Sequence, residues 1–145
     1  MPSIIVPSEY GYVLATTVAT SIYLVFLTSR VGKARGKANV PYPYAYAEKS
    51  EAEKDPLKNI FNCTQRAHQN TLEFWPVVTS LSLIGGLAHP QVAAAAHAWW
   101  LLGRIVYVRG YVTGNPRNRL YGVAGQLGLL PLLFTAISSV YYLIK

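Results

Sequence analysis

Charged side chains are scarce in this sequence of 145 residues. They make up 13% of the chain, whereas apolar residues make up 52%, and a typical soluble protein carries about 25% charged residues. Residues 10–29 and 120–144 contain no charged residue at all. Either run is long enough to cross a hydrocarbon core, which takes about 20 residues of α-helix. The composition therefore argues against an ordinary soluble domain and predicts an integral membrane protein.

Cysteine occurs once, as Cys63, and acidic residues occur six times. One cysteine excludes an internal disulfide and a cysteine-rich metal site. His68, His89 and His97 lack the spacing of metal ligands, so no metal site is predicted. The shortage of acidic residues leaves a net charge of +7. Because the basic residues flank the apolar runs, we expect no nucleic-acid partner.

Two further apolar runs, residues 74–88 and 92–103, are too short to cross a membrane alone. Each becomes long enough only if its helix takes in neighbouring charges, which would then face the interior of a helix bundle. A chain of this length fits one domain, residues 1–145. We therefore predict an all-α, integral membrane four-helix bundle, with helices near residues 8–30, 62–88, 91–113 and 119–144 and a loop at 31–61.

The basic residues predict how these helices are oriented. Twelve of the thirteen lysines and arginines lie between residues 30 and 66 or between 104 and 119. Basic connections stay on the cytosolic side of a membrane. We therefore expect the loop at 31–61 and the turn before residue 119 to face the cytosol, and both termini to face the other side.

Polar side chains gather at the cytosolic ends of the predicted helices. Arg66, Asn70 and Glu73 are spaced i, i+4 and i+7, and so share one helix face. A second helical face near the end of the third helix carries Arg104, Tyr107 and Tyr111, and further arginines are found at positions 35, 117 and 119. Ionisable groups at such a depth are expensive and mark functional sites by default.

These side chains match a particular kind of ligand. Guanidinium groups bind carboxylates through two parallel hydrogen bonds, and a carboxylate such as Glu73 suits an ammonium group. The set therefore favours a small ligand with carboxylates and one amine, bound beside lipid. Two alternatives stay open: the charges and tyrosines serve packing and membrane anchoring, or the polar face lines a small channel.

At this point the sequence resembles a known family. Residues 61–76, FNCTQRAHQNTLEFWP, are similar to the signature of the MAPEG family, the membrane-associated proteins of eicosanoid and glutathione metabolism. Residues 103–107, GRIVY, and 110–116, GYVTGNP, resemble its second characteristic region. The segments at 9–11 and 33–35 resemble its branch of type-three microsomal glutathione transferases.

The resemblance implies a homotrimer with glutathione sites between neighbouring subunits. It implies an endoplasmic-reticulum membrane location in eukaryotes, with the sites open to the cytosol. It assigns glutathione binding to residues of the first three helices, namely Arg35, Arg66, His68, Asn70, Glu73, Tyr107 and Tyr111. The family pattern has a glutamine at the place of His68 and a tyrosine at the place of Phe74.

The resemblance also implies the chemistry. Arg119, with Arg117 as the alternative, would hold the glutathione sulfur as a thiolate, which is the nucleophile. The thiolate would attack a lipophilic electrophile, or reduce a lipid hydroperoxide, in a lipid-side groove lined by Phe74, Trp75, Trp99 and Trp100. The alternative within the family is a non-catalytic protein that presents lipid to a partner, like the five-lipoxygenase-activating protein.

Overall fold

The computed structural model describes residues 6–145, so the first five residues of the expected domain lie outside it. Within the described residues the chain is helical and forms no strand, which confirms the all-α prediction. The elements are α1 (Tyr10–Ala38), α2 (Lys49–Ala52), α3 (Pro56–Gly85), α4 (Pro90–Tyr111), the 3-10 helix η1 (Pro116–Gly128) and α5 (Leu129–Ile144).

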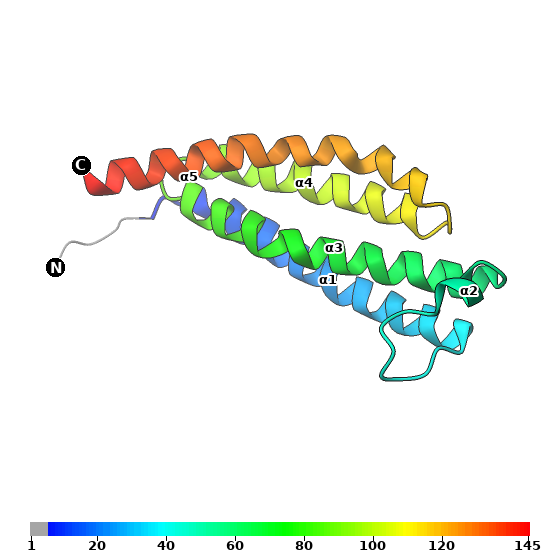
Figure 1. Cartoon of the computed structure of the whole chain (residues 1–145). Helices are drawn as coiled ribbons and strands as arrows, with labels where there is room; N and C mark the ends of the chain where they lie inside the picture. Colours follow the sequence, from blue (N-terminus) through cyan, green and yellow to red (C-terminus); the bar gives the residue numbers. More distant parts are fainter. Residues whose placement is uncertain (1–5) are drawn as a thin grey trace.

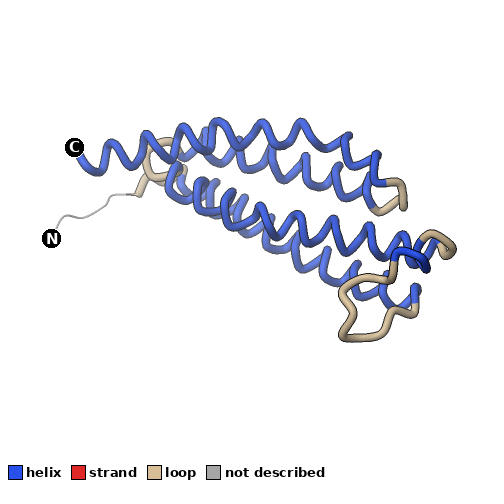
Figure 2. Tube along the Cα trace, in the orientation of Figure 1, coloured by secondary structure: helices blue, strands red, loops and turns tan. Residues whose placement is uncertain are grey.

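The long helices are arranged in two antiparallel pairs (Figures 1 and 2). One pair is α1 and α3, and the other is α4 and the continuous rod formed by η1 and α5. The pairs pack on each other through α3, which contacts α4 and α5, and through α1, which contacts α4. They lie closest near the two chain termini and diverge toward the end that carries α2 (Figure 1).

Two helical rods in the described part of the chain are long and apolar enough to cross a membrane. They are residues Tyr10–Ala38 and Pro116–Ile144. The other two long helices, α3 and α4, carry charges within their length, among them Arg66 and Glu73 on α3 and Arg104 on α4. Their crossing of the membrane, and with it the four-span topology, stays a prediction.

Helices α1 and α3 extend further at their expected cytosolic ends than the sequence predicts. α1 continues from residue 30 through the basic segment to Ala38, and ends where Asn39 adopts a left-handed conformation with φ of 51°. Lysine and arginine are good helix formers, so a basic run does not end a helix. α3 begins at Pro56, with Asp55 accepting a hydrogen bond from the backbone N–H of Leu57 at 2.8 Å. Residues 31–38 and 56–61 are therefore helical and not loop.

The fourth rod begins as the 3-10 helix η1 and packs closely on α4. Gly122, Gly125 and Gly128 recur every three residues, and a 3-10 helix has three residues per turn, so all three lie on one face. That face meets α4 so closely that a Cβ atom on Gly125 would lie 2.6 Å from Cα of Gly103. The absence of a side chain at these positions allows the two backbones to approach closely.

The core between the pairs contains both apolar and polar side chains. Trp100 is fully buried and packs among Val13, Val78 and Leu132. His97, also fully buried, is 3.0 Å from Oγ1 of Thr20 through Nε2 and 3.1 Å from Oγ of Ser82 through Nδ1. Because these three residues lie on α4, α1 and α3, one imidazole joins three helices.

Candidate functional site

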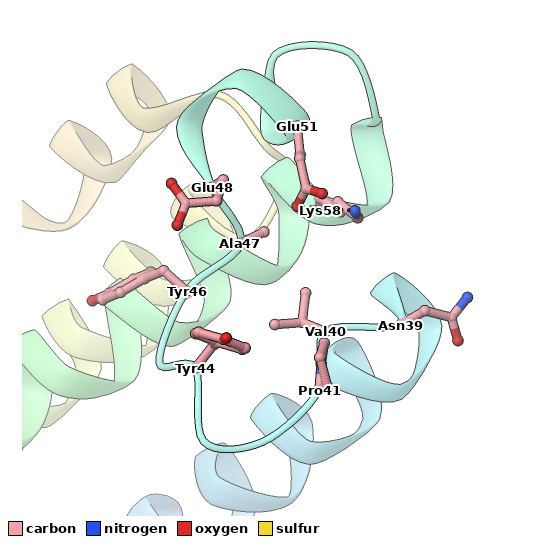
Figure 3. A pocket seen from close by; sticks show the side chains of 9 residues that line it. All are labelled: Asn39, Val40, Pro41, Tyr44, Tyr46, Ala47, Glu48, Glu51 and Lys58. Carbon is pink, nitrogen blue, oxygen red and sulfur yellow. Dashed lines mark ion pairs between the residues drawn. The ribbon is translucent and has the colours of Figure 1, made fainter.

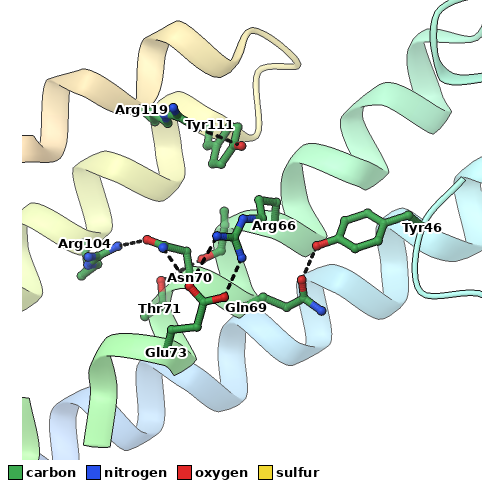
Figure 4. A network of polar contacts seen from close by, with 10 residues as sticks. Tyr46, Arg66, Gln69, Asn70, Thr71, Glu73, Arg104, Tyr111 and Arg119 are labelled. Atoms are coloured by element: carbon green, nitrogen blue, oxygen red, sulfur yellow. Dashed lines mark hydrogen bonds and ion pairs between the residues drawn. The ribbon is translucent and has the colours of Figure 1, made fainter. Parts of the chain in front are cut away.

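The centre of the site is a polar network on α3, seen in Figure 4. Nη1 of Arg66 lies 2.6 Å from Oε1 of Glu73, and Nη2 lies 3.4 Å from Oε2. Asn70 donates to Oε2 of Glu73 at 3.1 Å. The shared helix face predicted for these three residues is therefore present as a hydrogen-bonded set. The Arg66 and Glu73 side chains remain 44% and 52% exposed, so the pair is open to a ligand.

Arg104 connects this network to α4 (Figure 4). Its Nη1 donates to Oδ1 of Asn70 at 2.7 Å, and the residue is 2% exposed. The guanidinium is stacked on aromatic rings, with Cζ 4.7 Å from the ring centre of Phe74 and 4.9 Å from that of Tyr107. Nη2 is buried and has no hydrogen-bond partner among the described residues. Arg104 is thus held by an amide and by π faces, with spare donor capacity.

Across from α3, the end of α4 and the start of η1 bring two tyrosines and an arginine together. The rings of Tyr107 and Tyr111 meet edge to face at 5.6 Å. Nη1 of Arg119 donates to the Tyr111 hydroxyl at 3.3 Å, and its Cζ lies 5.4 Å from the Tyr111 ring centre. Arg119 has no ion pair with any described carboxylate, so its charge is available to an anion.

The 3-10 geometry separates Arg119 from Arg117. Arg119 is three residues before Gly122, so with three residues per turn it lies on the glycine face that meets α4. Arg117 is one third of a turn away from that face, is exposed, and makes no side-chain hydrogen bond or ion pair within the described residues. Between the two alternatives, the structure brings Arg119 to the tyrosines.

Two of the expected binding residues do not join this network within one chain. His68 lies two residues from Arg66 and from Asn70, and therefore on the other side of α3, where Nε2 is 3.2 Å from Oγ1 of Thr28. Arg35 is buried and donates to the carbonyl oxygens of Val40 and Tyr44 at 3.3 and 2.7 Å.

The four aromatic residues expected in a lipid-side groove differ in burial and do not line one common surface. Trp99 is exposed, donates from Nε1 to the carbonyl oxygen of Ala124 at 3.0 Å, and lies between two apolar hollows along α4 and the η1–α5 rod. Trp100 is fully buried in the core, because it lies on the inner face of α4, and so it does not line an open groove. Phe74 covers Arg104, and Trp75 is half-buried.

Sequence reasoning missed Tyr46 and Gln69, which extend the network toward the loop between α1 and α2. The Tyr46 hydroxyl donates to Oε1 of Gln69 (Figure 4). Burial raises the pKa of Tyr46 above its ordinary value, although the neighbouring Arg66 cation opposes the rise, so the phenol stays protonated at neutral pH. A tyrosine in a loop gives no periodic signal, which is why the sequence did not reveal it.

Tyr46 also lines a cavity of about 330 Å³ with mixed polar and apolar walls (Figure 3). The cavity lies under the loop between α1 and α2, and Lys58 and Glu51 form an ion pair of 3.0 Å on its wall. The loop is therefore anchored on α3 next to the network, and Tyr46 is the residue common to both.

The comparison with known families agrees with this arrangement. Residues 13–140 match the model of the MAPEG family. The chain belongs to the MAPEG family. It is also 32% identical over 136 residues to "Uncharacterized protein sll1147" of Synechocystis sp. (strain ATCC 27184 / PCC 6803 / Kazusa), an alignment that covers 91% of this chain and 89% of the relative. MAPEG membership, together with the two apolar rods, identifies a membrane protein.

The MAPEG family includes glutathione transferases and also non-catalytic members. Membership is therefore compatible with either class and does not by itself assign an activity. The choice depends on what the polar network and Arg119 can do.

Proposed function

We propose that this MAPEG protein is a membrane-bound glutathione transferase with glutathione peroxidase activity, similar to the type-three microsomal branch. The observation that carries the proposal is the arrangement of Arg66, Asn70 and Glu73 opposite Tyr111 and Arg119. Groups of both charges on α3 suit the two charges of glutathione, and Arg119 on the facing side has no acidic partner among the described residues. A lipid-presenting protein has no need of such a set.

Glutathione binding proceeds by exchange of ion-pair partners. The free protein pairs Arg66 with Glu73 in an exposed position, where solvent screening makes an ion pair weak. Opening the pair therefore costs little. Arg66 then binds a glutathione carboxylate and Glu73 binds the ammonium group, while Asn70 and Tyr107 complete the polar contacts.

Arg119 supplies the chemistry. Its guanidinium, near the Tyr111 hydroxyl, favours the thiolate of bound glutathione because an adjacent cation lowers a thiol pKa. With an aryl halide the sulfur forms a bond to carbon and halide leaves. With a lipid hydroperoxide, two glutathione molecules are oxidised to the disulfide, and the hydroperoxide is reduced to an alcohol and water. The electrophile approaches from the lipid side, along the apolar surface that carries Trp99.

The proposal includes a homotrimer in the endoplasmic-reticulum membrane with its sites facing the cytosol. The family resemblance implies sites between neighbouring subunits, and Arg35 and His68, which lie away from the network of their own chain, would join a site only across such an interface. The loop at 39–48 and the charged α2 lie at the network end of the molecule, which supports cytosolic access.

Calorimetry with glutathione on the purified protein in detergent tests the proposal. We expect binding by the wild type, and affinity weakened by roughly tenfold or more in Glu73→Gln, because a charge-assisted contact to the ammonium group is lost. Glu53 is an exposed carboxylate beside α2, so Glu53→Gln is the matched control and should bind glutathione as the wild type does. Failure of the wild type to bind glutathione would favour the lipid-presenting class instead.

A further inference from the structure

A second candidate site is a groove at the C-terminal end of α1, which carries basic residues and no acidic one. Arg30, Lys33 and Lys37 are spaced i, i+3 and i+7 and so form one stripe along α1. The stripe borders a groove of about 230 Å³ whose other wall is apolar and comes from α3 and the end of α4, with Leu57, Ile60 and Val112. The groove therefore has a cationic side and an apolar side.

The cations of this groove have no acidic partner in the structure. No aspartate or glutamate lines the groove. The ion pairs found among the described residues use Lys49, Lys58 and Arg66, and none uses the stripe. Lys33 and Lys37 are exposed, and Arg30 is half-buried beside Phe26, with Cζ 5.8 Å from the ring centre. Three positive charges thus face one small groove without a carboxylate to neutralise them.

The position of the groove along α1 indicates its ligand. α1 is one of the two rods able to cross the membrane, and the stripe occupies its last three turns. Lysine and arginine immediately beyond a membrane span attract anionic lipid headgroups, by about 1 kcal/mol for each basic residue. Arginine binds phosphate through parallel hydrogen bonds. The apolar wall is available to the first carbons of an acyl chain.

We propose that this groove binds the phosphate headgroup of an anionic phospholipid, with Arg30, Lys33 and Lys37 on the phosphate and Leu57 against the lipid chain. This site is separate from the glutathione network and does not depend on it. A free phosphate ion would use the cations alone, whereas a phospholipid uses both walls of the groove.

Native mass spectrometry of the full chain in detergent tests this proposal. The probes are phosphatidylglycerol and phosphatidylcholine with the same acyl chains. We expect the wild type to prefer phosphatidylglycerol, and Lys33→Gln/Lys37→Gln to bind it about 25-fold more weakly, at about fivefold for each lysine. Lys49→Gln/Lys54→Gln removes the same charge outside the groove and should keep the wild-type affinity.

Two further measurements separate the possible outcomes. Inorganic phosphate at millimolar concentration should leave phosphatidylglycerol bound, and Leu57→Asn should weaken phosphatidylglycerol binding although all charges remain. The proposal is overturned if the two lipids bind equally, if the control pair loses as much affinity as the groove pair, or if inorganic phosphate displaces the lipid. Both lysines are exposed, so circular dichroism should show the variants folded.

Discussion

Nη1 of Arg104 lies 2.7 Å from Oδ1 of Asn70, and this contact joins α4 to α3 within the polar network. The same amide donates from Nδ2 to Glu73 at 3.1 Å. Each end of the amide therefore meets the partner it requires: its oxygen accepts from a cation and its nitrogen donates to a carboxylate. Asn70 is the link between a buried arginine and an exposed acidic residue.

Replacing Asn70 by alanine should destabilise the protein by about 1.5–3 kcal/mol, because Arg104 loses a charge-assisted acceptor in a buried position. Thermal unfolding in detergent measures the loss. Gln65→Ala is the control, since Gln65 lies on the same helix and its side chain makes no hydrogen bond within the described residues. Equal losses in the two variants would show that the amide has no special role.

Arg119→Ala should lower kcat for glutathione conjugation by about 100-fold or more, the cost of removing one donor that stabilises developing negative charge. Arg117→Ala should leave kcat near the wild-type value, because Arg117 lies on another face of η1. Steady-state kinetics with an aryl halide and with a lipid hydroperoxide provides the measurement. If Arg119→Ala changes only the affinity for glutathione, Arg119 is a binding residue and not the thiol activator.

Ser82→Ala should destabilise the helix packing by about 0.6–1.7 kcal/mol, the range for hydrogen bonds between membrane helices. The reason is that Ser82 is 3.1 Å from Nδ1 of the fully buried His97. Thr79→Val, on the same helix, should cost less, because Oγ1 of Thr79 is buried without a hydrogen-bond partner in the described chain. Unfolding curves in detergent compare the two, and a larger loss in Thr79→Val would contradict the assignment.

Gly125→Ala should destabilise the protein by about 1–3 kcal/mol, because its new Cβ would overlap the backbone of Gly103. Gly32→Ala is the matched change on α1, where a Cβ has nothing within 4 Å, and should stabilise by about 0.5–1 kcal/mol through helix propensity. Opposite shifts in melting temperature are expected. A melting temperature unchanged in Gly125→Ala would mean that η1 and α4 separate without cost.

Residue spacing predicted much of the fold and of the site. The charge-free runs marked two of the rods, and the expected breaks between the second, third and fourth helices are present as the segments at 86–89 and 112–115. The helical period placed Arg66, Asn70 and Glu73 together, and also Tyr107 and Tyr111. These features depend only on local geometry, which a single sequence contains.

The rest depends on contacts between distant segments. The partners of Arg104 and of Tyr46 come from other elements, 34 and 23 residues away. The inward orientation of Trp100 and the outward orientation of Trp99 follow from which face of α4 packs on the other helices, and two adjacent tryptophans in an apolar stretch give no sign of that. The density of charge at residues 30–37 favours a loop in the sequence, whereas in the structure α1 continues through this segment without a break.

The three-residue turn of η1 makes the chain tolerant of length changes in one place and intolerant in another. Adding one residue between Arg119 and Gly122 would rotate the arginine by about 120° around the helix axis and remove it from Tyr111. Adding one residue in the turn before Pro116 would leave the spacing from Arg119 to the glycines intact. The number of residues between Arg119 and Gly122 must therefore stay constant to keep Arg119 at Tyr111, whereas the turn before Pro116 can vary in length.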